Sequence, residues 1–259
     1  MQVTTKQTLE ETNESAVELK GLIKKFGNLT AVNGLDLDIG WGEIFGLLGP
    51  NGAGKTTTVN MLSTLLVPTD GYAKVAGYDV VENANEVRKV IGLCPQQPAY
   101  FPYLTGRENI ELFGQLYSLP SKVLDERIEY LAKRVGLHDD IDRRASHYSG
   151  GMIRRISTIM ALIHDPSVAL LDEPTVAMDP VSRRSVWDFI KELRNQNKTI
   201  VLTTHYMEEA QELSDRVGII DEGRLIEVGP PQYLIDKYQV KNLEEVFVMR
   251  TGKNLREEV

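Results

Sequence analysis

The sequence predicts an α/β fold with a parallel-sheet core, an N-terminal antiparallel β layer and an inserted helical subdomain. Two observations lead to this prediction. Short apolar runs at residues 44–48, 168–171 and 200–203 alternate with segments of helical period, which is the pattern of βαβ units in a parallel sheet. From about residue 98 to residue 165 the apolar residues recur at helical spacing instead, which indicates a helical insertion.

The first strands are expected to form the small antiparallel layer. Leu35, Leu37 and Ile39 alternate with aspartates, which is the period-2 pattern of a half-buried strand. A further short strand is expected at residues 17–19, and residues 72–81 follow a turn and extend the same layer.

The other elements follow in chain order. The run 44–48 is apolar throughout, as in a strand that is buried on both faces. We expect, beyond it, a helix at 56–66, a short helix at 83–89, a strand at 90–93, helices at 108–116 and around 123–135, a helix at 181–194, a hairpin of 216–220 and 225–228, and a short helix at 231–238. The folded domain is thus expected to span residues 16–238, between a polar tail at 1–15 and a C-terminal tail at 239–259.

The composition agrees with one such domain and excludes several classes of protein. With 259 residues, 42% hydrophobic and 25% charged, the chain is neither low-complexity nor wholly disordered. Its net charge of −8 provides no basic surface, so we expect no nucleic-acid partner. Apolar runs are far shorter than the roughly 20 residues that cross a bilayer, so membrane contact is expected only through a partner.

The N-terminus and the single cysteine bear on localisation. Residues 1–15 lack the apolar segment of a signal peptide. Cys94 has no second cysteine with which to form an intrachain disulfide. We therefore expect a cytoplasmic protein.

A phosphate-binding loop follows the apolar run 44–48. Its residues fit G-x-x-x-x-G-K-[ST], with a buried strand before it and a helix after it. Converging backbone N–H groups would hold phosphate oxygens, Lys55 would bridge the β- and γ-phosphates, and the Thr56 hydroxyl would ligate Mg²⁺. The alternative is an ordinary glycine turn. The candidate ATP contacts are Gly49, Pro50, Asn51, Gly52, Ala53, Gly54, Lys55, Thr56 and Thr57.

Two carboxylates end the run 168–171. A neighbouring parallel strand would place Asp172 beside Thr56, where it completes the Mg²⁺ shell. Glu173, one step further, could polarise an attacking water as general base. The alternative is an acidic turn that caps a core strand.

A second anion-binding helix end is predicted at Ser149, Gly150 and Gly151. A serine N-cap followed by two glycines exposes N–H groups and a hydroxyl at the positive end of a helix dipole. Taken alone, this triplet would be a plain N-cap. Its position 23 residues before Asp172, together with the other motifs, favours the functional interpretation.

Together these motifs resemble those of ATP-binding cassette (ABC) ATPase subunits. The segments GPNGAGKTT, YSGGM and LLDEP, with Gln96, Asp179 and His205, stand in the order and spacing of that family. The chain looks most like ABC-2-type and drug-exporter subunits, because YSGGM is followed by Arg-Arg-Ile, LIHDP lies at 162–166 and LEEVFVMRTGK at 243–253. The resemblance implies a P-loop NTPase fold with a RecA-like core.

The resemblance also implies roles for single residues. Two cassettes stack head to tail in this family, so Ser149, Gly150 and Gly151 would contact the ATP of the partner subunit. Gln96 would contact Mg²⁺ or the attacking water. His205 would bind the γ-phosphate and hold Glu173 in line.

Further positions can be compared with the family, and one of them departs from its pattern. Phe26 would stack on adenine, although a core phenylalanine is the alternative. Asp179 would contact the opposing subunit. Ala177 stands where relatives often have glycine, which should reduce backbone freedom in that loop. The aromatic loop 98–103 would either help to receive a cytoplasmic helix of a membrane subunit or pack within the helical insertion.

The motifs and the resemblance together lead us to expect an ATPase, which converts ATP and water to ADP and phosphate. The resemblance implies that this ATPase drives a transporter, specifically an exporter. Its expected partners are a second cassette, as a homodimer, and a separate transmembrane permease at the cytoplasmic face of the membrane. A cytosolic non-transport ABC ATPase that acts on a ribosome or nucleic acid is the alternative. A small-molecule kinase has no use for Ser149 or for a pairing of Glu173 with His205.

Overall fold

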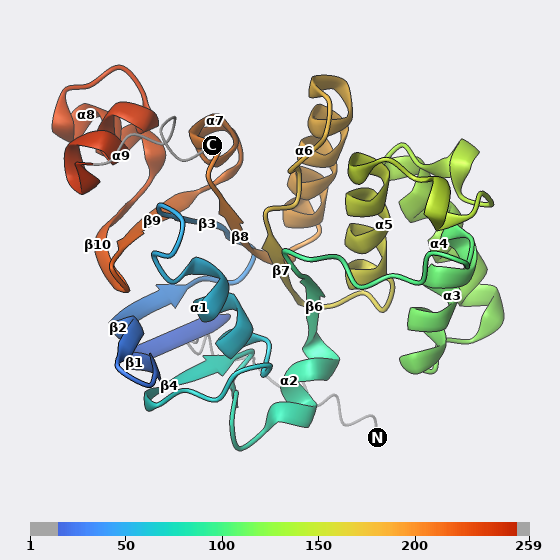
Figure 1. Ribbon diagram of the computed structural model, residues 1–259, viewed down its shortest axis with the longest axis horizontal. Coiled ribbons are helices and arrows are strands. Elements are labelled where there is room, and N and C mark those ends of the chain that lie inside the picture. The colour runs from blue at the N-terminus through green and yellow to red at the C-terminus, as the bar shows by residue number, and fades with distance from the viewer. Residues whose placement is uncertain (1–14, 253–259) are drawn as a thin grey trace, which may run out of the picture.

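The computed structural model describes residues 15–252, so most of the expected polar tail at 1–15 and the last seven residues of the expected C-terminal tail at 239–259 lie outside that range. Two sheets form the molecule, one of four strands in the order β2-β1-β4-β5 and one of six strands in the order β10-β9-β3-β8-β7-β6. Figure 1 shows the small sheet beside α1, and the helical insertion at the opposite end of the molecule.

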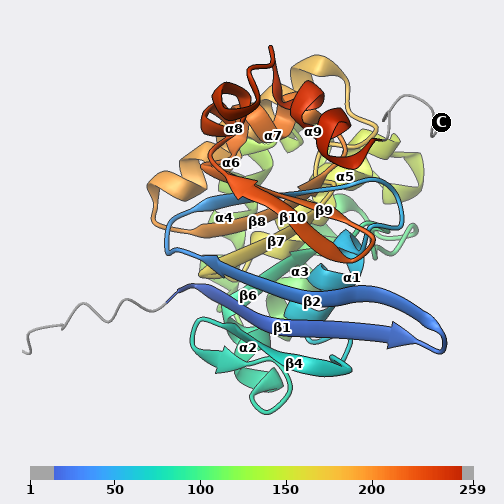
Figure 2. The ribbon, with the colours of Figure 1, turned by 90° about the vertical axis from the view of Figure 1, so that its left-hand side faces the viewer.

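The small sheet is the predicted antiparallel layer. It consists of β1 (Val17–Phe26), β2 (Leu29–Ile39), β4 (Asp70–Val75) and β5 (Tyr78–Asp79). Leu35, Leu37 and Ile39 are buried, and the aspartates between them are exposed, so the predicted alternation is confirmed. The first two strands are longer than expected and form one hairpin, which Figure 2 shows along its length.

The large sheet is the predicted parallel core. Its strands are β3 (Ile44–Leu48), β6 (Ile91–Cys94), β7 (Val168–Asp172), β8 (Thr199–Thr204), β9 (Arg216–Asp221) and β10 (Arg224–Gly229). All pairs are parallel except the β9–β10 hairpin at one edge. Every residue of β3, β7 and β8 is buried, as expected for strands covered on both faces.

Side-chain alternation along these strands divides the core in two. Val168 and Leu170 face a cluster shared with the small sheet and α1 (Lys55–Leu62). Ala169 and Leu171 face the opposite cluster, which includes α5 (Gly150–Leu162) and α6 (Pro180–Asn195). The sheet is therefore held from both sides, and its carboxyl ends are fixed for the side chains that follow them.

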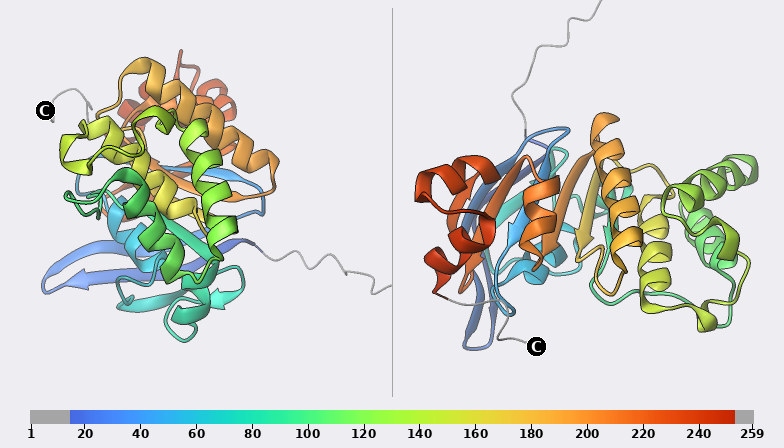
Figure 3. Two further views of the ribbon diagram at one scale, coloured as in Figure 1. Left: turned by 90° about the vertical axis from the view of Figure 1, so that its right-hand side faces the viewer. Right: turned by 90° about the horizontal axis from the view of Figure 1, so that it is seen from above.

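The predicted helical insertion is confirmed. It contains α3 (Gly106–Leu116), α4 (Ser121–Arg134) and two short 3₁₀ turns, η1 (His138–Asp140) and η2 (Ala145–His147), and the chain then returns to the core along α5. Figure 3 shows these helices beyond the edge of the large sheet. A capping box between Thr105 and Glu108 begins α3.

The C-terminal region contains more structure than a tail. α8 (Pro231–Tyr238) has the predicted bounds, whereas two further helices, α7 (Met207–Leu213) and α9 (Leu243–Thr251), are not among the elements expected from the sequence. Leu243, Val246 and Phe247 are fully buried against α7 and α8.

Two helices of the N-terminal half differ in how well they match their predictions. α2 (Ala84–Val90) agrees with its predicted bounds to within a residue at each end. The helix predicted at 56–66 ends earlier, at Leu62, because Thr64 takes a left-handed backbone conformation that cannot continue an α-helix.

Candidate functional site

The phosphate-binding loop joins the end of β3 to the first turn of α1. Gly52 and Gly54 have φ values of +78° and +108°, a backbone region in which side chains other than hydrogen are strained. At Gly49, a Cβ atom would meet the carbonyl oxygen of Ile220 on the neighbouring strand β9. The backbone path of the loop therefore requires glycine at these three positions.

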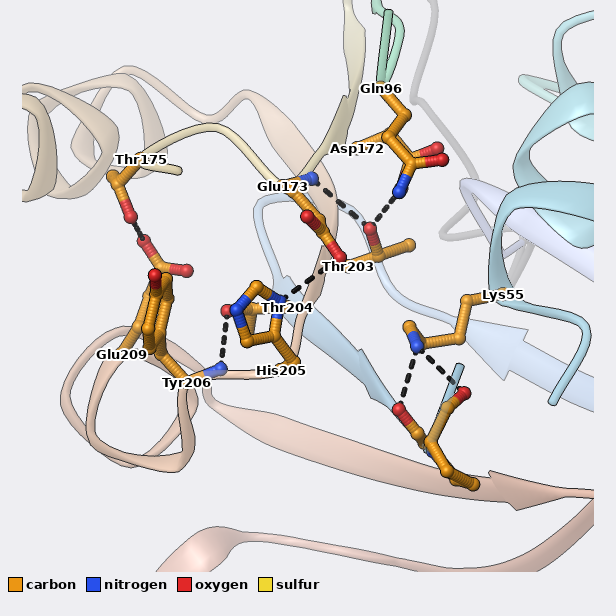
Figure 4. A network of polar contacts seen from close by, with 12 residues as sticks. Lys55, Gln96, Asp172, Glu173, Thr175, Thr203, Thr204, His205, Tyr206 and Glu209 are labelled. Atoms are coloured by element: carbon orange, nitrogen blue, oxygen red, sulfur yellow. Dashed lines mark hydrogen bonds and ion pairs between the residues drawn. The ribbon is translucent and has the colours of Figure 1, made fainter. Parts of the chain in front are cut away.

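Lys55 is the first residue of α1 and is buried. Its ammonium group donates hydrogen bonds to the carbonyl oxygens of Gly49, at 2.6 Å, and Pro50, at 3.0 Å, as Figure 4 shows. The loop thus holds a positive charge at its centre. A bound phosphate chain would offer this ammonium stronger, charged acceptors than neutral carbonyls.

Asp172 and Glu173 lie at the carboxyl end of β7, as predicted. Asp172 is buried and accepts a hydrogen bond from the hydroxyl of Thr203, its register partner on β8. The backbone N–H of Glu173 donates to the carbonyl and hydroxyl oxygens of the same threonine, at 3.0 and 3.2 Å. Thr203 therefore fixes both acidic residues relative to the sheet (Figure 4).

Glu173 has a backbone conformation that glutamate rarely adopts. Its φ is +55°, in the left-handed region, which costs free energy and is common at functional sites. The side chain turns toward His205, whose Nδ1 lies 3.1 Å from Glu173 Oε1. The predicted pairing of these two residues is thus present in the structure.

The pKa of Glu173 is lowered below the ordinary value of 4.5. The hydrogen bond with His205 is the main cause, burial opposes it, and the charges of His205, Lys55 and Arg154 act in the same direction as the hydrogen bond. Glu173 is therefore ionised at neutral pH. An ionised carboxylate held by a neighbouring imidazole can accept a proton from water.

One cavity brings most of the predicted residues together. It has a volume of about 410 Å³ and is lined by Asn51, Gly52, Ala53, Gly54, Lys55, Thr56, Thr57, Gln96 and Glu173. A Gly-rich loop, a lysine, two threonine hydroxyls and three further polar side chains therefore surround one space. This arrangement suits a polyphosphate, whose negative charge needs convergent donors.

The residues around this cavity also fit a magnesium ion shared with phosphate. Thr56 and Gln96 supply neutral oxygens at the cavity, and the carboxylate of Asp172 lies at the end of β7. The expectation that β7 directly neighbours the strand before the phosphate loop is wrong, because β8 lies between β3 and β7. Among residues 15–252, no group of three or more His, Cys, Asp or Glu side chains could hold a metal ion by itself. Mg²⁺ suits such a site, because it takes one or two protein ligands and completes its shell with phosphates and water.

The structure does not bring the Ser149 helix end to this cavity. Ser149 is the N-cap of α5, and its hydroxyl accepts from the N–H of Met152 at 3.3 Å. A Cβ atom on Gly151 would lie 3.1 Å from the carbonyl oxygen of Ala177, so the two loops are in close contact. Within one chain, Ser149 and its glycines therefore belong to a different surface from the phosphate-binding loop.

Three other predicted residues have clear positions. Phe26 is 47% exposed at the end of β1, so it is not a core residue, and it does not line the cavity. Asp179 is the N-cap of α6 and accepts from the N–H groups of Val181 and Ser182, both at 3.0 Å. Ala177 has a φ of +60°, where glycine would be unstrained.

Two functional candidates were missed by sequence reasoning. Thr203 could have been found, because it is a polar residue at the carboxyl end of a predicted strand that neighbours the one ending in Asp172. Arg154 had no such signal. It lies inside a helix, and only the three-dimensional structure shows that its side chain reaches the loops of Gln96 and Glu173.

A sequence model of the family described as ABC transporter matches residues 32–176 of this chain. The chain belongs to the ABC transporter family. Curated relatives agree with this assignment. The daunorubicin resistance ATP-binding protein DrrA3 of Streptomyces coeruleorubidus is 44% identical over 83% of this chain and 68% of its own length. ABC transporter A family member 10 of Arabidopsis thaliana is also 44% identical, over 88% of this chain and 25% of its own length.

A solved ABC cassette connects the fold to the reaction. The dimeric cassette MJ0796, in a post-hydrolysis state with ADP and phosphate bound, is 27% identical and superimposes with a TM-score of 0.76 over 83% of this chain and 98% of its own. Family and fold together identify the chain as an ATP-binding subunit that hydrolyses ATP. Among the described residues, no helix is long and apolar enough to cross a membrane.

Proposed function

We propose that this ABC subunit powers an exporter by hydrolysing ATP between two cassettes, with Glu173 as the general base. The observation that carries the proposal is the Glu173–His205 pair at the edge of the phosphate-loop cavity. In this scheme Lys55 and the loop N–H groups hold the triphosphate. Thr56, Gln96 and Asp172 hold Mg²⁺, which would neutralise phosphate charge, and Phe26 stacks on adenine.

The Ser149 helix end supports a dimeric site. Ser149, Gly150 and Gly151 begin a helix whose N-terminus suits an anion, yet they lie away from the cavity of their own chain. A second copy, stacked head to tail, would bring them to the open side of the bound triphosphate. Asp179 is proposed to contact the opposing subunit. A homodimer is the simplest assembly that supplies both halves of the site.

An apolar groove supports a membrane partner. The docking groove has a volume of about 290 Å³. Its lining comes from the segment after α1, from β6 and the loop after it, and from α3 and α5 with the residues that follow them: Leu65, Leu93, Pro95, Ala99, Phe113, Tyr117, Ser157, Met160, Ala161 and His164. Of the aromatic loop 98–103, Ala99 lines the groove, Tyr100 packs on the core, and Phe101 and Tyr103 are exposed. We propose that the groove receives an amphipathic cytoplasmic helix of a permease, which would place the subunit at the cytoplasmic face of the membrane.

The groove also adjoins the ATP site. Pro95 lines it, and the next residue, Gln96, lines the phosphate-loop cavity. A helix that moves in the groove would therefore displace the loop of Gln96 at the site of hydrolysis.

The name of one relative bears on direction and cargo. DrrA3 is named for daunorubicin resistance, which favours export as the direction of transport and amphiphilic small molecules as the class of cargo.

A pair of matched substitutions tests the permease proposal. Leu65 is 62% exposed and lines the groove, whereas Val67 is 60% exposed and does not line it. Leu65→Glu should abolish co-purification with the permease from detergent-solubilised membranes, because a carboxylate would be buried in an apolar contact. Val67→Glu should co-purify normally, and both should bind ATP as the wild type does. Equal co-purification of the two variants would contradict the proposed docking site.

A further inference from the structure

Arg154 is the largest side chain that is fully buried, with 1% of its surface exposed. It lies in the second turn of α5, five residues after Ser149. Burial of a guanidinium group is costly unless its charge and its donors are compensated. The hydrogen-bond acceptors of the Arg154 guanidinium group therefore indicate what this residue does.

The partners of Arg154 are backbone carbonyls of two catalytic loops. Its Nε donates to the carbonyl oxygen of Glu173 at 2.8 Å, and its Nη1 donates to those of Gln96, at 3.1 Å, and Pro95. These acceptors follow β7 and β6, which are neighbouring parallel strands. One planar side chain thus joins the loop of the proposed base to the loop of the proposed Mg²⁺ contact.

Within residues 15–252, no carboxylate forms a salt bridge with Arg154, although its charge acts on the carboxylate of Glu173. Its Nη2 is buried and has no hydrogen-bond partner within residues 15–252. An apolar residue at this position would avoid the cost of burying a charge, so stability alone does not explain the arginine. The unpaired donor also leaves the guanidinium able to bond a carbonyl that shifts toward it.

We propose that Arg154 is a positioning residue that locks the main chains of Gln96 and Glu173 to helix α5. The inference rests on the roles proposed above for Gln96, Glu173 and Ser149. Because Ser149 begins the same helix, a displacement of α5 when the partner's ATP docks on it would move both loops of its own site. Arg154 would thus connect the two ATP sites of a dimer through one rigid element.

The neighbouring arginine supplies a matched control. Arg155 lies on the same helix, but its Nη1 donates to the carbonyl oxygens of Val135 and Gly136 in the helical insertion, away from both loops. We would compare Arg154→Met and Arg154→Lys with Arg155→Met and Arg155→Lys. For each variant, kcat, KM for ATP, affinity for ATP and the melting temperature would be measured.

Arg154→Met should lower kcat at least about tenfold and leave ATP affinity within about twofold, because the phosphate loop is untouched and only the alignment of the reacting groups is lost. Arg154→Lys should fall between that variant and the wild type, since one ammonium group cannot bridge both loops as a planar guanidinium does. Both Arg155 variants should keep kcat within about twofold of the wild type. Should Arg154→Met be unstable, the comparison of Arg154→Lys with Arg155→Lys decides.

Wild-type kcat in Arg154→Lys and Arg154→Met would overturn the inference. So would an equal loss of kcat in the Arg154 and Arg155 variants, because the effect would then be general to the helix. Glu173→Gln, measured in parallel, separates this failure from failure of the proposed function. If Glu173→Gln is inactive and the Arg154 variants are active, only the role of Arg154 is wrong; if Glu173→Gln is active, the proposed base is wrong.

Discussion

Glu173 combines three features that a base needs. Its left-handed backbone directs its side chain toward the cavity, its N–H is anchored on Thr203, and its carboxylate is held 3.1 Å from His205 Nδ1. The strain of that backbone is tolerated because the strands on either side are buried and fixed. A simple acidic turn that caps a strand would not need this strained backbone conformation at Glu173.

The lowered pKa of Glu173 predicts a pH-dependent contribution to stability. A carboxylate whose folded pKa lies below its unfolded value stabilises the fold above the unfolded pKa, near 4.5, and this contribution is lost as pH falls through the folded pKa. Glu173→Gln lacks that contribution. The melting temperature of the wild type minus that of Glu173→Gln should therefore decrease as pH is lowered from 7 to 3.5.

Thermal melts of the two proteins across that pH range make the comparison. General acid denaturation affects both proteins alike, so it cancels in the difference. Parallel curves would mean that the hydrogen bond with His205 does not stabilise the ionised form of Glu173.

At the scale of single elements, α9 shows where local sequence patterns are insufficient. Of its nine residues only Leu243, Val246 and Phe247 are buried, and the apolar residue Met249 on the same helix is exposed, so the sequence does not show which residues face the core. The helix depends on the surface that α7 and α8 offer, a tertiary contact that no local pattern contains. The strands of the parallel core, by contrast, were predictable from continuous apolar runs, because burial on both faces leaves that signal in the sequence.

The packing of α9 leads to a stability prediction. Phe247 is fully buried between α7 and α8, so Phe247→Ala should lower the free energy of unfolding by about 3–5 kcal/mol. Met249, on the same helix, is 58% exposed, and Met249→Ala should change it by less than about 0.5 kcal/mol. Urea denaturation measures both values. A similar small loss in the two variants would mean that α9 is not a packed part of the domain.

The candidate site was predictable only in part, for a related reason. The phosphate loop and the acidic strand end are contiguous in sequence, so their chemistry could be read from a few adjacent residues. The anchoring of Asp172 and Glu173 by Thr203 depends on the register of β7 against β8. The contacts of Arg154 depend on how α5 packs beneath two loops. Register and packing are properties of the folded molecule, and one sequence does not reveal them.

At the scale of the whole molecule, the phosphate loop and the second anion-binding helix N-terminus do not share a cavity. The phosphate loop and Glu173 line one cavity, and the N-terminus of α5 lies outside it. A second subunit is therefore needed to complete each ATP site. ATP, and not the protein surface alone, should join the two subunits, because the triphosphate is the ligand they share.

The most direct measurement of this central claim is the mass in solution of Glu173→Gln with Mg²⁺ and ATP, together with its rate of phosphate release. We expect negligible turnover and an ATP-dependent dimer with twice the mass of the 29.1 kDa chain, which becomes monomeric when ATP is removed. Retained ATP binding with hydrolysis near the wild-type rate would contradict Glu173 as the base. A mass that stays monomeric with ATP bound would contradict the shared site.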